Sequence, residues 1–323
     1  MKMTSFHRLL SITFLYAVCA MTLHAQHFSF MTYNCENAFD TISTPGHADH
    51  DFLPDGEQHW TRWRFSQKMN RIAQVFLAAD TLHPLDMAVL QEVESDTVLT
   101  WLVRRTPLAS MGYEYVMTDS RDQRGINVAL VYQPFTFRPF AVRTIGLSDE
   151  YLRQHHFTPT RDILHVSGRC ASGDTLDVFA LHLPSRLGQG EADVKRRELQ
   201  RLLFASIDSL LAARPSAKLI VAGDFNEAPS KRQMRRTAHL CNLMLGRKGG
   251  SYKFRGRWEW IDQVWVSDSL RAAVGDVRAL RLPFLLEDDE GWGGAKPFRT
   301  FYGPAYHRGY SDHLPVVVRF RLR

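Results

Sequence analysis

Short apolar runs recur along the chain, and residues that favour turns separate them. Some runs alternate between apolar and polar positions, and others are almost continuously apolar. Alternation is typical of strands with one buried face, and continuity is typical of strands buried on both faces. We therefore predict seven β-strands, over residues 28–33, 86–90, 126–132, 175–181, 218–222, 261–266 and 315–320.

Two segments have the period of a helix instead. In residues 64–79 and 191–213, apolar side chains recur at steps of three and four residues and therefore share one helix face. Pro215 ends the second of these helices. On the outer, solvent-facing side of that helix we expect Lys195, Arg196 and Arg197.

These elements fit one α/β domain. No repeat, low-complexity tract or linker rich in Pro, Gly and Ser divides the chain. Two sheets packed face to face, with helices on their outer faces, would accommodate many strands and few helices. The 323 residues are 45% hydrophobic and 23% charged, which excludes a disordered chain and a multi-span membrane protein. The net charge of +6 is compatible with an anionic substrate but does not specify one.

The first 25 residues have the pattern of a secretory signal peptide. Lys2 and Arg8 precede an apolar run over residues 9–23, and this run is shorter than the ~20 residues of a membrane-spanning helix. We place cleavage after Ala25. Residues 26–323 then form one exported domain, periplasmic or extracellular, without an integral membrane segment. An uncleaved N-terminal anchor is the competing interpretation.

Three cysteines remain after this cleavage, Cys35, Cys170 and Cys241. Three widely spaced thiols make neither a disulfide framework nor a zinc site. One pair could form in an oxidising compartment, and the sequence does not select which.

Carboxylates, amides and two histidines occupy the ends of the predicted strands. Strand ends hold short side chains rigidly and can bring them to one place. Oxygen donors of this kind suit Mg²⁺ or Mn²⁺ rather than zinc, and histidines can transfer protons near neutral pH. The residues are Asn34, Glu92, His182, Asp224, Asn226, Asp262, Asp312 and His313.

The order of these residues resembles the endonuclease/exonuclease/phosphatase superfamily, whose members include deoxyribonuclease-like metallo-phosphodiesterases. The matching segments span nearly the whole mature chain, and together they indicate the superfamily rather than one member. The resemblance implies a four-layer α/β/β/α sandwich, in which helices flank two packed mixed sheets. With the predicted signal peptide, it indicates an exported, bacterial-type member. The segments are Thr32-Tyr33-Asn34, Leu90-Gln91-Glu92, Ala180-Leu181-His182, Gly223-Asp224-Phe225-Asn226, Ile261-Asp262 and Ser311-Asp312-His313.

The resemblance also implies a metal site. Glu92 is similar to the family's principal metal ligand, with Asn34 beside it, and Asp312 is similar to a further metal contact. Asp224 is similar to the residue that orients or deprotonates the attacking water. A divalent cation with several donors neutralises the charge that grows on a phosphoryl group.

Further catalytic roles follow from the same resemblance. Asp262 and His313 are similar to a carboxylate–imidazole pair, in which the carboxylate fixes the imidazole and stabilises its charged form. Asn226 is similar to a donor to phosphoryl oxygens. His182 is similar to a histidine that binds the phosphate or protonates the leaving oxygen.

A smaller group of residues is expected to bind substrate. Arg161 is similar to a phosphate-contacting arginine of the deoxyribonuclease branch, and Arg124 and Asn127 are expected to line the same cleft. No segment matches the cleft tyrosine of the abasic-site enzymes. Tyr113 and Tyr115 are the candidates for that position.

Two basic clusters and one aromatic loop bear on the choice of substrate. If both clusters flank the cleft, they form a stripe for a polyanion; otherwise they are solvated surface charges. The aromatic residues could wedge into nucleic acid, contact lipid headgroups or pack. The clusters are Lys231, Arg232, Arg235 and Arg236, and Lys253, Arg255 and Arg257; the aromatic residues are Trp292, Phe298, Phe301, Tyr302 and Tyr306.

Three functions remain open at this point. We expect a monomeric, secreted, Mg²⁺- or Mn²⁺-dependent phosphodiesterase or nuclease. The alternative is a hydrolase of the same fold for lipid headgroups or small phosphate esters. A non-catalytic binding protein is the third, and the complete set of polar residues argues against it.

Overall fold

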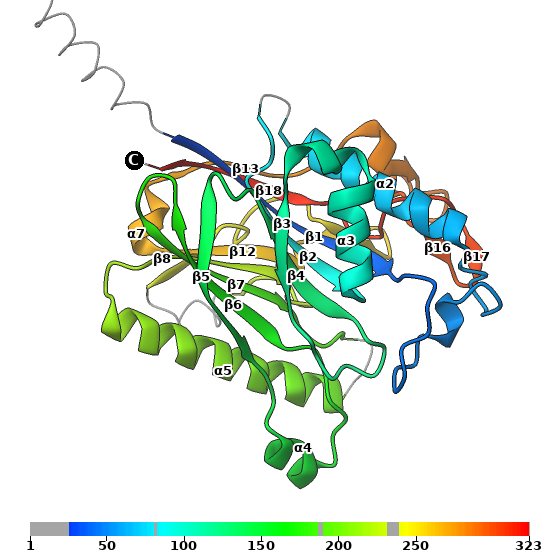
Figure 1. The fold of residues 1–323 in the computed structure, drawn as a ribbon, viewed down its shortest axis with the longest axis horizontal. Coiled ribbons are helices and arrows are strands. Elements are labelled where there is room, and N and C mark those ends of the chain that lie inside the picture. Colours follow the sequence, from blue (N-terminus) through cyan, green and yellow to red (C-terminus); the bar gives the residue numbers. More distant parts are fainter. Residues whose placement is uncertain (1–25, 81–82, 187–189, 231–238, 323) are drawn as a thin grey trace, which may run out of the picture.

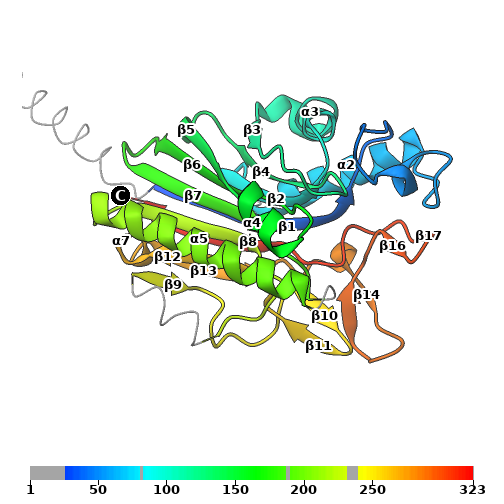
Figure 2. The ribbon, with the colours of Figure 1, turned by 90° about the horizontal axis from the view of Figure 1, so that it is seen from below.

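The computed structural model describes residues 26–80, 83–186, 190–230 and 239–322. Two six-stranded sheets lie face to face, and helices cover their outer faces (Figures 1 and 2). The first sheet has the order β13 (Val274–Ala279), β18 (Val316–Leu322), β1 (Gln26–Ala38), β2 (Met87–Val93), β4 (Asn127–Tyr132) and β3 (Glu114–Met117). The second has the order β5 (Phe137–Ile145), β6 (Ile163–Cys170), β7 (Thr175–His182), β8 (Lys218–Asp224), β12 (Asp262–Ser267) and β9 (Leu240–Asn242).

Each sheet is built around one pair of parallel strands. β1 pairs with β2, and β7 pairs with β8, in parallel. The neighbours on either side of these pairs are antiparallel. Because the two parallel pairs pack on each other, the carboxyl ends of four strands meet at one end of the sandwich.

Alternate residues of the central strands face different layers. Phe30 and Val89 of the first sheet face Ile220 of the second in the core between the sheets. Their neighbours Met31 and Leu90 face the helices on the outside of the first sheet. Successive strand side chains point to opposite faces, so the continuous apolar runs are strands buried on both faces.

Helices complete the four layers of the α/β/β/α sandwich. Two of them cover the first sheet, and one long helix covers the second (Figures 1 and 2). The Thr61 side chain accepts a hydrogen bond from Arg64 N, and Ser95 does the same for Val98 N, each cap stabilising its helix by about 1 kcal/mol. The helices are α2 (Arg62–Ala79) and α3 (Asp96–Arg105) on the first sheet, α5 (Glu191–Ala213) on the second, and the short α4 (Asp149–His155) and α7 (Asp268–Arg271).

Short elements fill the connections. The hairpins are β10 (Tyr252–Phe254) with β11 (Arg257–Glu259), β14 (Leu286–Asp288) with β15 (Ala295–Pro297), and β16 (Phe301–Tyr302) with β17 (Ala305–Tyr306). The single-turn 3₁₀ helices are η1 (His50–Phe52), η2 (Pro107–Met111) and η3 (Pro283–Leu285). The polar segments 41–59 and 282–309 therefore contain ordered turns and hairpins.

All seven predicted strands and both predicted helices are present, with ends that differ by a few residues. One prediction about α5 is wrong, because Lys195 and Arg196 are buried rather than on its solvent-facing side. Lys195 Nζ donates a hydrogen bond to Thr158 O and Arg196 donates one to Pro184 O, both at 2.9 Å. The two cations thereby fasten the start of α5 to neighbouring loops.

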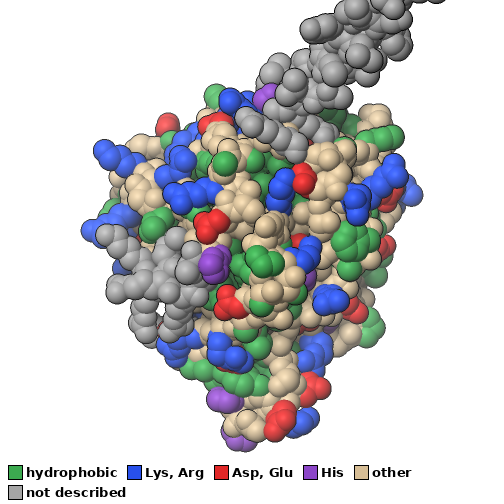
Figure 3. Space-filling model, turned by 90° about the vertical axis from the view of Figure 1, so that its left-hand side faces the viewer, with side chains coloured by type: hydrophobic (Ala, Val, Ile, Leu, Met, Phe, Trp, Pro, Cys, Tyr) green, Lys and Arg blue, Asp and Glu red, His purple; other side chains and the backbone are tan. Residues whose placement is uncertain are grey.

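The described cysteines do not pair with one another. All three cysteines between residues 26 and 322 carry free thiols. Within the described part of the chain, no helix has the length and apolar character needed to cross a membrane. The end of the sandwich at which the chain terminates carries basic, acidic and histidine side chains interspersed (Figure 3).

Candidate active site

Segments that are far apart in the sequence meet at the carboxyl ends of the parallel strands. Asn34 lies on β1 and Asp224 ends β8, and Asn34 Nδ2 is 3.2 Å from Asp224 Oδ2 although 190 residues separate them. The same nitrogen is 3.5 Å from Glu92 Oε1. The fold thus brings one amide and two carboxylates into direct contact.

The backbone at Glu92 is bent in a way that aims its carboxylate. Its φ of 58° is in the left-handed region, which is uncommon for a residue with a side chain and often marks a functional site. The pairing of β2 with β4 shifts register here, between Gln91 and Val93. Glu92 Oε2 accepts a hydrogen bond from Asn37 N at 2.8 Å and lies 4.0 Å from a guanidinium nitrogen of Arg124.

His182 ends β7 and lies opposite Asp224 in the parallel register. Its Nε2 is 3.6 Å from Asp224 Oδ2 and 3.9 Å from Glu92 Oε1. Burial, with the guanidinium groups of Arg161 and Arg124 nearby, lowers the pKa of His182 well below its usual 6.5. The imidazole is therefore neutral at pH 7, and it can donate or accept one hydrogen bond at the edge that faces the carboxylates.

Gly223 allows this approach of β7 and β8. Its φ is 146°, and a Cβ at this position would lie 1.8 Å from the carbonyl oxygen of Leu181. Because Leu181 pairs with Gly223 and His182 pairs with Asp224, only glycine lets the two strands lie this close beside His182 and Asp224.

Asp262 and His313 form a buried carboxylate–imidazole pair. Asp262 Oδ2 lies 2.7 Å from His313 Nδ1 and accepts a hydrogen bond from Ser251 Oγ at 2.6 Å. Burial opposes charge on the imidazole, but the carboxylates of Asp262 and Asp312 prevail and raise the pKa of His313 well above 6.5. His313 Nε2 lies 4.0 Å from Asp224 Oδ2 and 3.9 Å from Asp312 Oδ1, so the charged edge of the ring faces the other acidic groups.

Asp224 lies at the centre of this arrangement. Burial and the Asp262 carboxylate raise the pKa of Asp224 to about 7, and a carboxyl group with a near-neutral pKa can exchange a proton with water. Asp224 Oδ1 accepts a hydrogen bond from Asn226 N at 2.7 Å. Asn226 has a φ of 53°, and its side-chain nitrogen donates to Leu183 O at 2.9 Å, so this amide holds the turn after β8 against the end of β7.

The predicted phosphate-binding residues differ in their availability. Arg161 donates to Asp122 Oδ2 at 3.1 Å and to a backbone oxygen at 3.0 Å. Arg124 donates to Asn37 Oδ1, and its side chain is half exposed. Asn127 is buried, and its side-chain nitrogen donates to two backbone oxygens, at 2.9 and 3.1 Å. Asn127 therefore holds the loop that carries Arg124 and has no free amide hydrogen for a substrate.

Three charged residues that sequence reasoning missed, Glu36, Lys68 and Arg299, lie behind Asp312. An Arg299 nitrogen is 3.4 Å from Asp312 Oδ2 and 3.0 Å from Glu36 Oε1. Burial and the charge of Asp312 raise the pKa of Glu36 to about 7. Lys68 of α2 is fully buried and donates to Thr300 Oγ1 and to a backbone carbonyl of the same loop, each at 2.5 Å. The signal in the sequence is a lysine on the apolar face of a predicted helix.

The basic clusters and the aromatic loop are only partly free to meet a substrate. Lys231, Arg232, Arg235 and Arg236 lie outside the described residues. In the second cluster Lys253 pairs with Asp289 at 2.8 Å, and both side chains are nearly buried. Phe301 is buried against Trp60, with ring centres 5.6 Å apart, whereas Trp292 is 64% exposed. Much of this loop therefore packs against the rest of the protein.

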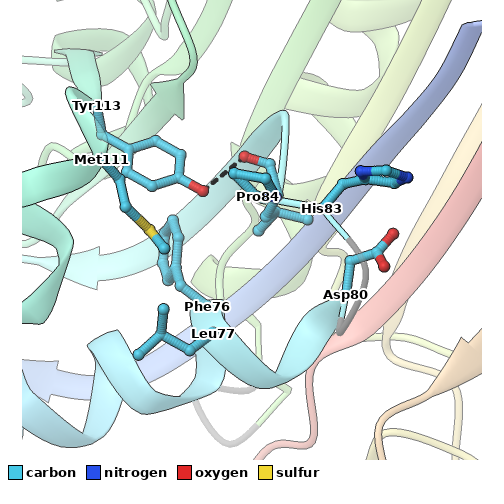
Figure 4. A pocket seen from close by; sticks show the side chains of 8 residues that line it. Phe76, Leu77, Asp80, His83, Pro84, Met111 and Tyr113 are labelled. Atoms are coloured by element: carbon cyan, nitrogen blue, oxygen red, sulfur yellow. Dashed lines mark hydrogen bonds between the residues drawn. The ribbon is translucent and has the colours of Figure 1, made fainter.

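The candidate cleft tyrosine Tyr113 lies far from the candidate catalytic residues. It lines a cavity of about 240 Å³ at the amino end of β2, where its hydroxyl donates to Leu85 O at 2.7 Å (Figure 4). Phe76 and Leu77, from the last turns of α2, close the same cavity. Asn34 and Glu92 lie toward the carboxyl ends of β1 and β2, so this cavity belongs to the opposite end of the molecule.

The donor set fits a hard divalent cation. Ligand atoms of Asp224, Asp262 and His313 all lie within 4.8 Å of one another, and Asp262 Oδ1 is buried without a described hydrogen-bond partner. Because Asp262 and His313 already bind each other, we assign them to the carboxylate–imidazole pair. Glu92, with Asn34 beside it, then presents the oxygen donors suited to the cation, although Asn34 Oδ1 accepts a hydrogen bond from Glu36 N at 2.9 Å. A bound cation would withdraw charge from the phosphoryl oxygens of an ester.

Comparisons with known proteins identify the family and the fold. The Endonuclease/Exonuclease/phosphatase family model matches residues 29–322. The mannosyl-6-phosphatase Bt3783 of Bacteroides thetaiotaomicron has a similar structure, with a TM-score of 0.58, 20% identity, and 91% of this chain and 99% of that chain covered.

Two animal proteins are similar to the same extent. The human Nocturnin catalytic domain matches with a TM-score of 0.55 and 19% identity, over 91% of this chain and 94% of that chain. Truncated Caenorhabditis elegans TDP2 matches with a TM-score of 0.57 and 15% identity, over 93% of this chain and 99% of that chain. No curated protein sequence gives a significant match. Since the family model covers nearly the whole described fold, the chain belongs to the endonuclease/exonuclease/phosphatase family of metal-dependent phosphoric ester hydrolases.

Proposed function

We propose that the chain is an exported, Mg²⁺- or Mn²⁺-dependent phosphodiesterase that hydrolyses nucleic acid. The observation that carries this proposal is the convergence of Asp224, Asp262 and His313 within 4.8 Å, next to Glu92 and Asn34. A phosphodiester is anionic, so its hydrolysis requires positive charge at the phosphoryl oxygens and a proton acceptor for the attacking water. This site contains groups for both tasks.

The chain's own residues divide the work as follows. Asp224 orients the attacking water and accepts its proton, for which a pKa of about 7 is suitable. His313, held by Asp262, donates from Nε2 to a phosphoryl oxygen as charge grows on it. Neutral His182 contacts the phosphate or the leaving oxygen from the other side. Arg161 adds positive charge nearby.

The test uses the purified chain 26–323 with plasmid DNA, single-stranded DNA, RNA and bis(p-nitrophenyl) phosphate. We expect hydrolysis with Mg²⁺ or Mn²⁺, its loss in EDTA, and its loss in Asp224→Asn at equal metal concentration. Glu114→Gln is a matched control, because Glu114 is a half-exposed carboxylate on the edge strand β3. Turnover of phosphate monoesters alone, with every diester untouched, would contradict the proposal.

A phosphomonoesterase is the second candidate. It is favoured by the structural similarity to a mannosyl-6-phosphatase. Release of inorganic phosphate from sugar phosphates, measured beside the diester assay, distinguishes the two functions. A monoesterase would release phosphate faster from the sugar phosphates than from any nucleic acid with a terminal phosphate.

Export is part of the proposal and rests on residues 1–25, which lie outside the described residues. The charged start and the apolar run after it support a cleaved signal. Expression of the full chain in a bacterial host, followed by fractionation and amino-terminal sequencing, tests this. We expect a periplasmic or extracellular product that begins at Gln26; a membrane-bound, full-length product would contradict it.

A further inference from the structure

Three arginines lie over three aromatic rings beside the start of α2. The pairs are Arg62 over Trp101 at 5.4 Å, Arg64 over Tyr306 at 4.5 Å and Arg308 over Trp63 at 5.9 Å, each measured from the guanidinium carbon to the ring centre, and we call these six residues the arginine–aromatic surface. The contributing segments are α2, α3 and the β16–β17 hairpin with Arg308, the second residue after it. Segments from three parts of the chain therefore build one surface.

The positive charge of this surface is not neutralised within the described chain. None of its three arginines has a described carboxylate within the 4.0 Å ion-pair limit. All 18 residues of α2 include no aspartate or glutamate. Arg62 and Arg64 lie in the first helical turn, where the helix dipole disfavours positive charge. These arginines therefore do not stabilise α2 electrostatically. Arg64 also donates a hydrogen bond to Gln58 O, but no described carboxylate offsets the three charges, which can attract an anion.

An aromatic face is available beside the charge. The Trp63 side chain is 54% exposed, although tryptophan is a large apolar residue. Its ring centre lies 6.4 Å from that of Tyr306, with the rings nearly perpendicular, so Tyr306 fixes one edge of the indole. The surface thus offers a positioned flat ring together with guanidinium groups.

One loop connects the arginine–aromatic surface to the candidate catalytic residues. Arg308 precedes His313 by five residues in the same loop, and Arg299 of that loop contacts Asp312. Lys68 fastens the loop to α2 through Thr300. The β16–β17 hairpin and the start of α2 lie side by side at the end of the sandwich where β1 and β2 finish (Figures 1 and 2). A chain cleaved at the catalytic residues can extend over this surface.

We propose that the arginine–aromatic surface binds a single-stranded segment of nucleic acid that flanks the phosphodiester to be cleaved. This inference rests on the proposed function and names its substrate class. Guanidinium groups bind backbone phosphates, and an exposed aromatic ring stacks an unpaired base, which is how proteins hold single strands without sequence preference. In a duplex the base faces are occupied by neighbouring bases, so Trp63 would have nothing to stack on.

The experiment measures binding without catalysis. A fluorescent single-stranded oligodeoxynucleotide is titrated with the chain 26–323 in EDTA, and anisotropy reports the affinity. The variants are Trp63→Ala, Arg308→Gln and the conservative Trp63→Phe. Arg321→Gln is the matched control, because Arg321 is an exposed arginine on β18 at the end remote from His313. Hydrolysis of bis(p-nitrophenyl) phosphate with Mg²⁺ tests that the catalytic residues are intact.

We expect Trp63→Ala to weaken binding on the order of tenfold, with Trp63→Phe close to the parent chain. Arg308→Gln should reduce the slope of log affinity against log salt by about 0.7, which corresponds to one lost phosphate contact on a single strand. Arg321→Gln should change neither quantity. Hydrolysis of the small diester should be the same in all four variants and the parent.

Several results would overturn the inference. Unchanged affinity for the single strand in Trp63→Ala and Arg308→Gln would do so. So would variants that lose as much affinity, or more, for duplex DNA or for a sulfated polysaccharide as for the single strand. The two proposals fail separately. If the parent chain cleaves nucleic acid but the variants bind the oligonucleotide normally, the binding site is not on this surface, and the proposed function stands. If the parent binds single strands through this surface but cleaves none with metal, the proposed function fails.

Discussion

Asp262 Oδ2 and His313 Nδ1 lie 2.7 Å apart, and the carboxylate keeps the buried imidazole in its charged form. The geometry of this pair comes from the strands around it. Asp262 lies opposite Asp224 in the pairing of β12 with β8, and His313 forms a β-bridge with Tyr252. Ser251 connects both sides, since its hydroxyl donates to Asp262 and its carbonyl accepts from Leu314 N.

Asp262→Asn should lower the pKa of His313 toward or below 6.5, because the largest cause of its elevation is removed. Turnover should fall by roughly 10²–10⁴-fold, as for the loss of a positioned acid or base. Imidazole titration by NMR and diester hydrolysis measure the two effects. Ser251→Ala, which keeps the carboxylate, is the milder comparison. An unchanged His313 titration would refute the pairing.

Glu92→Gln should weaken the apparent affinity for Mg²⁺ by at least tenfold, because a charged oxygen donor is replaced by a neutral amide. Raising the Mg²⁺ concentration should partly restore turnover. Activity as a function of metal concentration measures this, and circular dichroism should show an unchanged fold. A variant that unfolds would show instead that Glu92 is a structural residue.

His313→Ala should abolish turnover while cation binding is retained, since we assign the cation to Glu92 and Asn34. Calorimetric titration with Mn²⁺ and the diester assay, run on the same preparation, provide the two readouts. Full activity would remove His313 from the mechanism. Loss of cation binding would make it a ligand, as its 4.8 Å grouping with Asp224 and Asp262 also allows.

Lys68→Met should destabilise the protein by about 2–4 kcal/mol, because Thr300 and a backbone carbonyl lose a buried charged donor. Glu36, whose carboxylate lies near this ammonium group, loses a compensating charge as well. Urea unfolding measures the loss. Arg71→Met is a comparison on the more exposed side of α2, and equal stability of the two variants would contradict the role of Lys68.

Asp177 on β7 leads to a prediction of how the stability of the fold depends on pH. Its Oδ1 accepts from Ser167 Oγ at 2.5 Å and faces His165 Nε2 at 3.0 Å, and Oδ2 accepts from Arg214 at 2.8 Å. Burial opposes ionisation, but these partners prevail and lower the pKa of Asp177 below its usual 3.8. A carboxyl with a depressed folded pKa stabilises the fold above its unfolded pKa, and this contribution is lost as pH falls through the folded pKa.

Asp177→Asn should therefore lower the free energy of unfolding at pH 7 by about 2–4 kcal/mol, with a smaller difference below about pH 3. Urea unfolding at both values measures it. Ser167, His165 and Asp177 have the residue types of a nucleophilic triad, but the serine hydroxyl and the imidazole share one carboxylate oxygen. Ser167→Ala should thus leave turnover unchanged, and a loss would assign this cluster a catalytic role.

Sequence patterns predicted the central strands and the polar residues at their ends, because both follow from local rules. A strand buried on both faces is continuously apolar, and a short polar residue directly after it marks the edge of a sheet. The predicted set meets at one end of the sandwich, with Asn34, Asp224 and Glu92 in direct contact.

The elements that were missed depend on tertiary context. β5 is an edge strand whose residues alternate irregularly around a register shift at Pro139, so its pattern is weak. Lys68, Glu36 and Arg299 become meaningful only when the loop that contains Thr300 folds back onto α2. The role of the aromatic loop could not be predicted either, since only the structure shows that Phe301 packs against Trp60.

Gly223 limits how this enzyme can be altered. The missing side chain sets the spacing of two neighbouring strands, and a methyl group there would collide with Leu181 O. Any replacement would wedge the strands apart and separate His182 from Asp224 without touching either residue. Directed evolution for new substrates should therefore recover changes in the surrounding loops and leave this position invariant.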